Sequence, residues 1–376
     1  MSIKVWLAAN TLDYPQGGGH LWVYLNWALG LQALGCQVIW LESVDSRMPV
    51  HEVHALTFAL KRRLEPYKLA KRLALCSRNG EPLSQTVTES CIDIETAAEA
   101  DLLLNVAYRI PPHLVERFRR SALLDIDPGL CQIWMSMGQL NVARHDIYFT
   151  IGETVGTSVA RFPDCGLQWH YTPPAVFLPA WPPTREDATT PYTTVSDWWG
   201  EWMDFQGEMY DNSKRITFLE YANLPSQTSV PLELALCLGP DENEERLFLE
   251  QQGWKIRHAW EVTSTPEQYR AYIQHSRGEF SCAKPSCMHL QNAWISDRTL
   301  CYLASGKPAV LQHTGPSRFL PDGAGLFRFH CLEDAARGLD TVDADYEHQS
   351  FLARKLAEEY FDAYKVAQSV LERALA

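Results

Sequence analysis

Three glycines and a histidine, Gly17-Gly18-Gly19-His20, follow a short apolar segment near the start of the 376-residue sequence. Glycines at such a place let backbone N–H groups approach a ligand closely, and the first turn of a helix that follows them attracts negative charge. Gly18 and Gly19 are therefore candidates for contact with an anionic ligand, with a flexible turn as the alternative. The spacing differs from G-x-G-x-x-G, so the dinucleotide fingerprint is not met.

Carboxylates follow two further apolar segments. Asp125 and Asp127 lie in the run Asp-Ile-Asp-Pro-Gly at the end of the segment 121–126, and Glu153 follows residues 145–151. If both segments are strands of a parallel sheet, these side chains lie at the edge where such sheets meet ligands. The alternative for the first pair is a solvated turn built on Asp-Pro-Gly.

One part of the sequence is rich in aromatic residues. They are Trp198, Trp199, Trp202 and Phe205, with Asp197, Glu201 and Asp204 among them. Aromatic rings beside carboxylates suit stacking against a sugar or an aromatic ligand, and burial in a core is the alternative. The sequence contains no H-E-x-x-H, no phosphate-binding P-loop and no serine nucleophile elbow, so protease, NTPase and esterase activities lack support.

Composition narrows the class of protein. Hydrophobic residues make up 46% and charged residues 21%, as in a globular protein. The net charge of −13 argues against a nucleic-acid partner. A basic stretch, Lys61-Arg62-Arg63 with Lys68, Lys71 and Arg72, is either a solvated helix face or a contact for an anionic membrane surface or acceptor. At most peripheral membrane contact is therefore expected.

The cysteines and the start of the chain indicate in which cellular compartment the protein is expected. None of the 10 cysteines forms a C-x-x-C pair, which fits reduced residues rather than a disulfide framework or a zinc site. The N-terminus enters a strand directly without a secretory signal, and the longest apolar stretch, 21–34, is too short to cross a bilayer. We expect a cytoplasmic protein without a metal site.

Alternating segments predict an α/β fold. Residues 4–9 form a strand, a helix runs from His20 to Leu34 and ends at Gly35, and residues 36–41 form a strand parallel to the first. Further strands are expected at 100–106, 121–126, 145–151, 192–196, 232–238, 254–258, 278–282 and 307–311, and further helices at 244–252, 266–276 and 296–305. Such alternation is typical of doubly wound parallel sheets.

The chain is too long for one ordinary core, and its prolines indicate where it divides. Prolines concentrate between Pro173 and Pro191. We therefore expect an N-terminal domain over 1–178, a linker over 179–191, a C-terminal domain over 192–349, and a helix over 350–376 that packs back on the first domain. A ligand cleft is expected between the two domains, at the carboxyl ends of their strands.

The first forty residues resemble a known enzyme family. Gly17–His20, the following helix and the strand opened by Gly35-Cys-Gln-Val are similar to the start of the peptidoglycan N-acetylglucosaminyltransferases, which have the GT-B architecture of two facing Rossmann-like domains. In that family, and in plant small-molecule glucosyltransferases, a histidine at this position is the proposed general base. The resemblance implies that His20 takes the proton of an acceptor hydroxyl, and a helix-capping or packing histidine is the alternative. The family's acceptor motifs are absent, so a peptidoglycan precursor is not implied.

A second resemblance lies in the C-terminal half. Gly278–Lys284, Ser296-Asp297-Arg298 and the segment Tyr302–Val310 look like the donor-binding region of GT-B enzymes, including glycosyltransferase family 4. There an acidic residue holds the donor ribose, and a turn after the next strand meets the diphosphate.

Carried onto this sequence, the second resemblance gives each residue an expected role. Lys284 and Arg298 offset the diphosphate charge, and Asp297 binds the ribose. The diphosphate turn is expected to use Thr314, Gly315 and Ser317. The family-4 carboxylate stands closer to the Gly-x-Pro turn, where this chain has Cys301, and the alternative for Asp297 is a helix-capping role beside Ser296.

Together the resemblances imply a glycosyltransferase. It would move a sugar from a nucleotide sugar to a hydroxyl of a small-molecule, glycan or lipid-linked acceptor, with no metal and no cofactor. Asp127 would orient His20, and Asp125 and Glu153 would bind the acceptor. We favour inversion at the anomeric carbon; under retention, His20 would contact the donor sugar instead. A nucleotide-sugar epimerase of the same fold and a non-catalytic nucleotide-sugar-binding protein are the alternatives.

Overall fold

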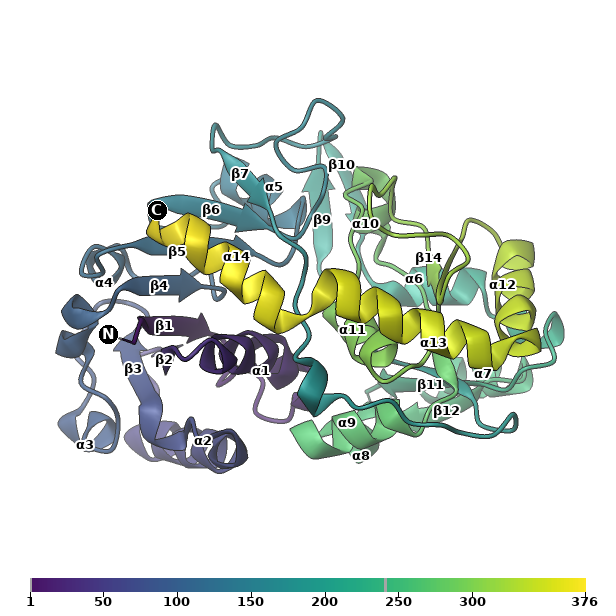
Figure 1. The fold of residues 1–376 in the computed structure, drawn as a ribbon, viewed down its shortest axis with the longest axis horizontal. Coiled ribbons are helices and arrows are strands. Elements are labelled where there is room, and N and C mark those ends of the chain that lie inside the picture. Colours follow the sequence, from purple (N-terminus) through teal and green to yellow (C-terminus); the bar gives the residue numbers. More distant parts are fainter. Residues whose placement is uncertain (1, 240–241) are drawn as a thin grey trace. The chain divides into compact units, whose positions relative to one another are not determined.

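The computed structural model describes residues 2–239 and 242–376, and Figure 1 shows its fold. The chain divides into two compact units. The first contains the chain up to Gly156, Pro163–Phe177 and Ala363–Ala376. The second contains Thr157–Phe162 and Leu178–Asp362. A short segment from the first half of the sequence therefore belongs to the second unit, and the C-terminal helix belongs to the first.

The first unit is built on a seven-stranded sheet in the order β3-β2-β1-β4-β5-β6-β7, with every neighbouring pair parallel. The strands are β1 (Lys4–Ala9), β2 (Gln37–Val44), β3 (Leu73–Ser77), β4 (Leu102–Asn105), β5 (Ser121–Asp125), β6 (Ile147–Thr150) and β7 (Trp169–Tyr171). The apolar runs of β1 to β5 are buried on both faces, as in parallel sheets covered by helices. The strand order reverses between β1 and β4.

Helices complete the first unit. They are α1 (Gly18–Ala33), α2 (Val50–Leu64), α3 (Gln85–Thr88), α4 (Pro112–Val115), α5 (Leu130–Ser136) and α14 (Ala363–Leu375). α14 packs against α1, and the contact is tight because a Cβ atom on Gly30 would lie 2.6 Å from the carbonyl oxygen of Ala363. The backbone N–H of Ala363 also donates to the carbonyl of Val176, at 2.9 Å.

The second unit has a six-stranded parallel sheet in the order β12-β11-β8-β13-β14-β15. The strands are β8 (Tyr192–Asp197), β11 (Leu232–Cys237), β12 (Lys255–His258), β13 (Gly278–Ser281), β14 (Ala309–Gln312) and β15 (Leu326–Phe329). An antiparallel hairpin, β9 (Trp202–Phe205) and β10 (Glu208–Asp211), stands apart from this sheet. The order of the large sheet reverses between β8 and β13.

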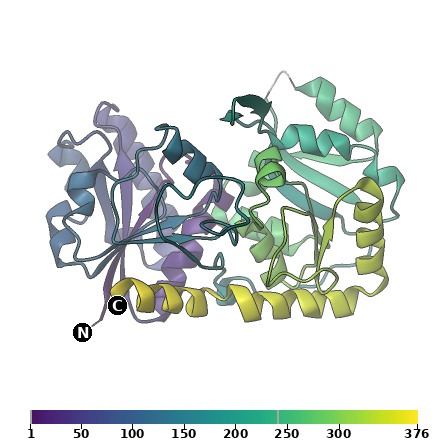
Figure 2. The same ribbon diagram turned by 90° about the horizontal axis from the view of Figure 1, so that it is seen from above.

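Helices lie on both sides of the second sheet (Figure 2). They are α6 (Lys214–Glu220), α7 (Asn243–Gln251), α8 (Ala259–Thr263), α9 (Pro266–Gln274), α10 (Pro285–Leu290), α11 (Asp297–Ala304), α12 (Leu332–Ala344) and α13 (Tyr346–Leu356). The sequence predicts one helix over 350–376. The structure instead has α13, a π-helical turn at Ala357–Phe361, and α14, because Asp362 leaves the helical conformation with ψ 115°.

Candidate functional site

In each sheet the point where the strand order reverses places two loops side by side at the carboxyl edge, which is where ligands bind in open α/β folds. In the first unit these are the loops after β1 and β4. In the second unit they are the loops after β8 and β13. We describe the two half-sites separately.

His20 lies in the first turn of α1, beside the loop that follows β1. Its Nε2 is 2.7 Å from the carbonyl oxygen of Asn10, and its ring centroid lies 4.5 Å from that of Tyr14, with the two rings tilted by 50°. A carbonyl oxygen only accepts hydrogen bonds, so this contact assigns the proton to Nε2 and leaves Nδ1 as the proton acceptor. The imidazole is thus held in a tautomer that suits a base. Its hydrogen-bond partner is Asn10, whereas the sequence predicts Asp127.

The loop that carries Asn10 is fixed by a buried carboxylate. Glu42, in β2, accepts hydrogen bonds from the backbone N–H groups of Thr11 and Leu12 and from the Thr11 hydroxyl. The indole of Trp40 donates to it as well, at 2.8 Å. Burial raises the pKa of Glu42, and the hydrogen bonds from Thr11 and Trp40 oppose that rise. Glu42 therefore sets the position of the backbone that orients His20.

Asp125 and Asp127 are joined through a tyrosine. The Tyr108 hydroxyl accepts from the backbone N–H groups of Ile126 and Asp127 and lies 3.2 Å from an Asp125 oxygen. Tyr108 itself has a positive φ of 58°, a conformation that non-glycine residues seldom adopt. Asp125 is completely buried and also accepts from Gln132, at 2.8 Å. Burial, with a smaller effect from the charge of Asp127, raises its pKa to about 6.

Asp125 is buried and hydrogen-bonded, so its role is to hold the loop after β5 in place. Asp127 is only partly buried and is the more accessible of the two carboxylates. The next loop packs directly against this one, because a Cβ atom on Gly152 would lie 2.3 Å from Cβ of Pro128. Glu153 follows Gly152 and is buried. The structure thus brings together, at one edge of the first sheet, the three carboxylates that the sequence singles out.

Three cations gather where the strand order of the second sheet reverses. Lys214 begins α6 after β8, Lys284 precedes α10 after β13, and Arg298 lies in the first turn of α11. Burial, together with the charges of Arg298 and Lys284, lowers the pKa of Lys214 to about 7. Across residues 2–239 and 242–376, neither lysine forms an ion pair with a carboxylate. Their positive charge is available to an anionic ligand.

Arg298 is engaged by the protein itself. Its Nε donates to Glu279 at 2.6 Å, and its two terminal nitrogens donate to the carbonyl of Val195 at 2.7 Å and to the Ser281 hydroxyl at 2.6 Å. Glu279 is fully buried within β13. The guanidinium therefore joins α11 to β8 and β13, while its charge still acts on Lys214. Asp297 is partly exposed at the start of α11, and Ser296 caps that helix through the N–H of Arg298.

The turn after β14 is held against the loop between α10 and α11. The Thr314 hydroxyl donates to the carbonyl of Trp294 at 2.6 Å. Gly315 has a φ of +128°, and a Cβ atom there would lie 2.6 Å from the Gln291 carbonyl oxygen. Gln291 and Ala293 both have positive φ, 51° and 57°, so this loop stores backbone strain of the kind found at binding sites. Ser317 accepts from the N–H groups of Phe319 and Leu320, which shapes the end of the turn.

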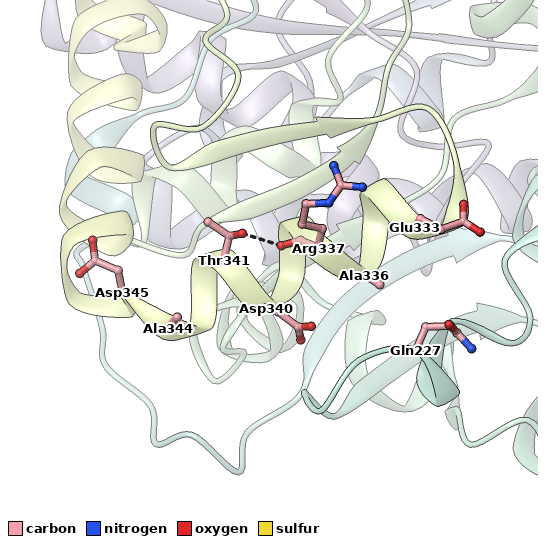
Figure 3. A pocket seen from close by; sticks show the side chains of 8 residues that line it. All are labelled: Gln227, Glu333, Ala336, Arg337, Asp340, Thr341, Ala344 and Asp345. Carbon is pink, nitrogen blue, oxygen red and sulfur yellow. Dashed lines mark hydrogen bonds between the residues drawn. The ribbon is translucent and has the colours of Figure 1, made fainter.

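A hollow of about 780 Å³ lies elsewhere on the second unit, along the outer face of α12 (Figure 3). It is lined by Gln227, Glu333, Ala336, Arg337, Asp340, Thr341, Ala344 and Asp345. It includes none of the residues at the carboxyl ends of β8, β13 and β14. Its acidic lining would repel a diphosphate, so it is not the donor site that the sequence predicts.

Sequence reasoning missed Lys214, Tyr108 and Glu42. Lys214 follows the hairpin β9–β10, so nothing in its local sequence links it to Lys284. Glu42 directly follows the strand expected at residues 36–41, and nothing in its local sequence marks it as a residue that positions a loop. Among the described residues, no group of three or more His, Cys, Asp or Glu side chains could hold a metal ion. In the same parts of the chain, no helix has the length and apolarity needed to cross a membrane.

No family model and no curated protein matches the chain by sequence. Solved structures do match. Anabaena HepE in complex with UDP and glucose aligns with a TM-score of 0.59 at 12% identity, over 99% of each chain. A sucrose-phosphate synthase from Thermosynechococcus elongatus aligns with a TM-score of 0.55 at 10% identity, over 99% of this chain and 98% of that one.

An alpha-glucosyltransferase in complex with UDP and a 13-mer DNA aligns with a TM-score of 0.61 at 10% identity, over 100% of each chain. The family-4 and peptidoglycan-type relationships suggested by the sequence stay predictions. At these identities the likeness shows the fold, and the expectation of a GT-B architecture is confirmed: the chain has the GT-B fold, with a seven-stranded and a six-stranded parallel sheet in its two units.

Proposed function

We propose that this protein transfers a sugar from a nucleotide sugar to a hydroxyl acceptor. The observation that carries the proposal is the approach of two lysines, Lys214 and Lys284, to the strand-order reversal of the second sheet, where neither forms an ion pair with a carboxylate among the described residues. A buried amine whose pKa is lowered to about 7 is costly to keep charged, and a diphosphate would relieve that cost. Structures of the same fold hold UDP or UDP-glucose, so a uridine diphosphate sugar is the first donor to test.

In the proposed reaction the bond between the anomeric carbon and the diphosphate oxygen breaks, and the acceptor oxygen forms a new bond to that carbon. Lys214 and Lys284 stabilise the charge that develops on the leaving diphosphate. Arg298 positions α11, and Asp297 at its start binds the ribose. The turn of Thr314, Gly315 and Ser317 completes the diphosphate site.

The acceptor proton passes to Nδ1 of His20, which the contact with Asn10 leaves free to receive it. This assignment belongs to an inverting reaction. Gly18 and Gly19 supply the uncapped N-terminus of α1, which favours negative charge nearby. Asp127 is the accessible carboxylate of this half-site and binds an acceptor hydroxyl. No step of this scheme calls for a metal ion.

The test is product analysis with UDP-glucose as donor and water or simple sugars as acceptors. We expect release of UDP and free or transferred glucose, and loss of both products in Lys214→Met and Lys284→Met. Conversion of UDP-glucose to an epimer without UDP release would establish the epimerase instead. Tight UDP-glucose binding with no product of either kind would establish a binding protein.

A further inference from the structure

The backbone of Lys214 is held by hydrogen bonds on either side of it in the chain. The Asn212 side chain accepts from the N–H of Ser286 at 2.9 Å. The Thr217 hydroxyl donates to the carbonyl of Ala283, also at 2.9 Å. These two bonds attach the start of α6 to α10 and to the loop that precedes it. They fix the backbone of Lys214, but not the flexible four-carbon stem that carries its ammonium group.

The end of the Lys214 side chain lies over an aromatic ring. Its Nζ is 5.9 Å from the ring centroid of Trp294, which is within the range of a cation–π contact. Trp294 belongs to the loop between α10 and α11 and is partly exposed. The ring therefore contacts the part of the lysine that the backbone hydrogen bonds leave free to move.

The charged groups around Lys214 come from several elements. Besides burial, the cations Arg298 in α11 and Lys284 before α10 lower the pKa of Lys214. Glu279 in β13 acts in the opposite direction, but it already forms an ion pair of 2.6 Å with Arg298. The Cys287 thiol of α10 acts in the same direction as Glu279, with a smaller effect. Ionised side chains therefore give the Lys214 ammonium little support.

The ring of Trp294 supplies support of another kind. The face of an indole carries the negative part of the ring quadrupole, and tryptophan binds cations better than the other aromatic side chains do. A ring against Nζ thus favours the charged amine without adding a carboxylate. This difference is important at a diphosphate site, because a carboxylate would repel the diphosphate and a neutral ring does not.

Trp294 is also attached to the turn after β14. The Thr314 hydroxyl donates to the Trp294 carbonyl at 2.6 Å, and the N–H of Ala293 donates to the Thr314 carbonyl at 3.0 Å. The N–H of Trp294 donates to the Asn292 side chain at 3.1 Å. The backbone that carries the ring is therefore fixed to the turn that the sequence predicts for the diphosphate.

We propose that Trp294 is a positioning residue of the donor site: its ring keeps the Lys214 ammonium charged and directs it toward the turn at Thr314. This role rests on the glycosyl transfer argued above and deepens it. Trp294 acts through Lys214 and does not touch the reacting atoms. Without the ring, the amine loses its proton at a lower pH. Loss of the ring should therefore weaken nucleotide binding only at pH values where the amine has become neutral.

The experiment compares the affinity for UDP of Trp294→Leu and of the unaltered chain between about pH 5.5 and pH 9. The ratio of the two affinities cancels the titration of UDP itself, whose terminal phosphate loses its second proton at about pH 6. At the acid end, where Lys214 is charged in both proteins, we expect a ratio near one. At the alkaline end Trp294→Leu should bind about tenfold more weakly, which corresponds to a downward shift of about one pH unit in the titration of Lys214.

Matched variants and a direct titration locate the effect. Trp294→Phe keeps a weaker ring and should lose about threefold at the alkaline end. Trp260→Leu removes a tryptophan that is 57% exposed in α8, and it should bind as the unaltered chain does at every pH. The pKa of Lys214 is measured in the nucleotide-free proteins from the ¹³C shift of the lysine ε-carbon, with Lys214→Met to identify the signal. It should fall by about one unit in Trp294→Leu and by less in Trp294→Phe.

Three results would overturn the proposal. An unchanged pKa of Lys214 in Trp294→Leu would show that the ring does not support the charge. A loss of UDP affinity that is the same at every pH would show that Trp294 does not act through Lys214. Both results leave glycosyl transfer standing, because UDP still binds to the unaltered chain. No binding of UDP, GDP, dTDP, CDP or ADP to that chain at any pH would count against glycosyl transfer itself, and the role of Trp294 would fall with it. If Trp294→Leu does not fold, the smaller shift in Trp294→Phe decides.

Discussion

The imidazole of His20 is oriented by groups that are not themselves reactive. The carbonyl oxygen of Asn10 accepts a hydrogen bond from Nε2. The loop that contains Asn10 is held by Glu42, which accepts hydrogen bonds from the N–H groups of Thr11 and Leu12. A carboxylate buried this deeply is costly unless its oxygens are satisfied, and here backbone, hydroxyl and indole donors satisfy them. The hydrogen bonds that stabilise the buried Glu42 carboxylate therefore also fix the loop that sets the tautomer of His20.

Replacing His20 with alanine should lower kcat by about 10²- to 10⁴-fold, the usual contribution of a general base, while the UDP thermal shift stays the same. The steady-state rate of UDP release measures kcat. His54→Ala, in the exposed part of α2, is the control and should be silent. Near-normal turnover in His20→Ala would contradict the base and point to a retaining reaction.

The titration of Lys214 should make the affinity for UDP depend on pH. Its pKa is lowered to about 7 in the nucleotide-free protein, and a bound diphosphate would raise it again. Below that pH the amine is already charged. Above it, each binding event must take up a proton, so UDP affinity should fall by up to about tenfold per pH unit.

Calorimetric titration of UDP between pH 7 and 9, in buffers of different ionisation enthalpy, measures both the affinity and the proton uptake. Lys214→Met should bind more weakly and lose the dependence over this range. A flat profile for the unaltered chain would show that Lys214 does not meet the diphosphate.

Among the elements, α11 shows how one residue can serve fold and site together. Arg298 joins it to β13 through the buried Glu279 and to β8 through the carbonyl of Val195. Leaving one member of such a pair alone in the interior typically costs about 3–5 kcal/mol. Arg298→Met should therefore lower the free energy of unfolding of the second unit by about that amount. Lys284→Met should leave it nearly unchanged, and denaturant titration compares the two. Equal, small losses would mean that Arg298 is free to bind ligand.

The regular elements were largely predictable, because apolar runs and helix ends are local signals. Strands β1, β2, β8, β11 and β13 occur within a few residues of their predicted ranges. β3 and β15 were missed since each is a short run beside charged residues, and only pairing with a neighbour makes it a strand. The hairpin was missed because Trp202–Phe205 and Glu208–Asp211 mix acidic and aromatic residues without clean alternation.

The site was predictable only where its residues sit in a recognisable motif. His20 follows a glycine cluster and Lys284 follows a predicted strand, so both could be named from the sequence. Lys214 meets Lys284 only through the strand order of the second sheet, which crosses from β8 to β13. Tyr108 reaches the Asp125 loop through a positive-φ backbone that no sequence pattern indicates. The order of strands in a sheet and a strained backbone conformation both depend on the tertiary structure, so local sequence patterns do not reveal them.

At the scale of the whole chain, the C-terminal helix α14 returns to the first unit and packs closely against α1. Gly30 in α1 has no room for a side chain against Ala363. Gly30→Val should lower the stability of the first unit by about 1–3 kcal/mol, the usual cost of overpacking, in spite of the better helix propensity of valine. Ala33→Ser, at an exposed position of α1, is the control. The midpoint of thermal unfolding measures the loss of stability. An unchanged midpoint would show that α14 can shift to accommodate the valine side chain.

The most direct test of nucleotide-sugar transfer is the thermal unfolding of the chain with UDP, GDP, dTDP, CDP and ADP, repeated for the double variant Lys214→Met, Lys284→Met. One nucleotide at about 100 times its dissociation constant should add about 2.7 kcal/mol to the free energy of unfolding. We predict that result for UDP, with the shift lost in the double variant. No shift with any nucleotide, or a shift that survives the loss of both lysines, would contradict the donor site and with it the proposed activity.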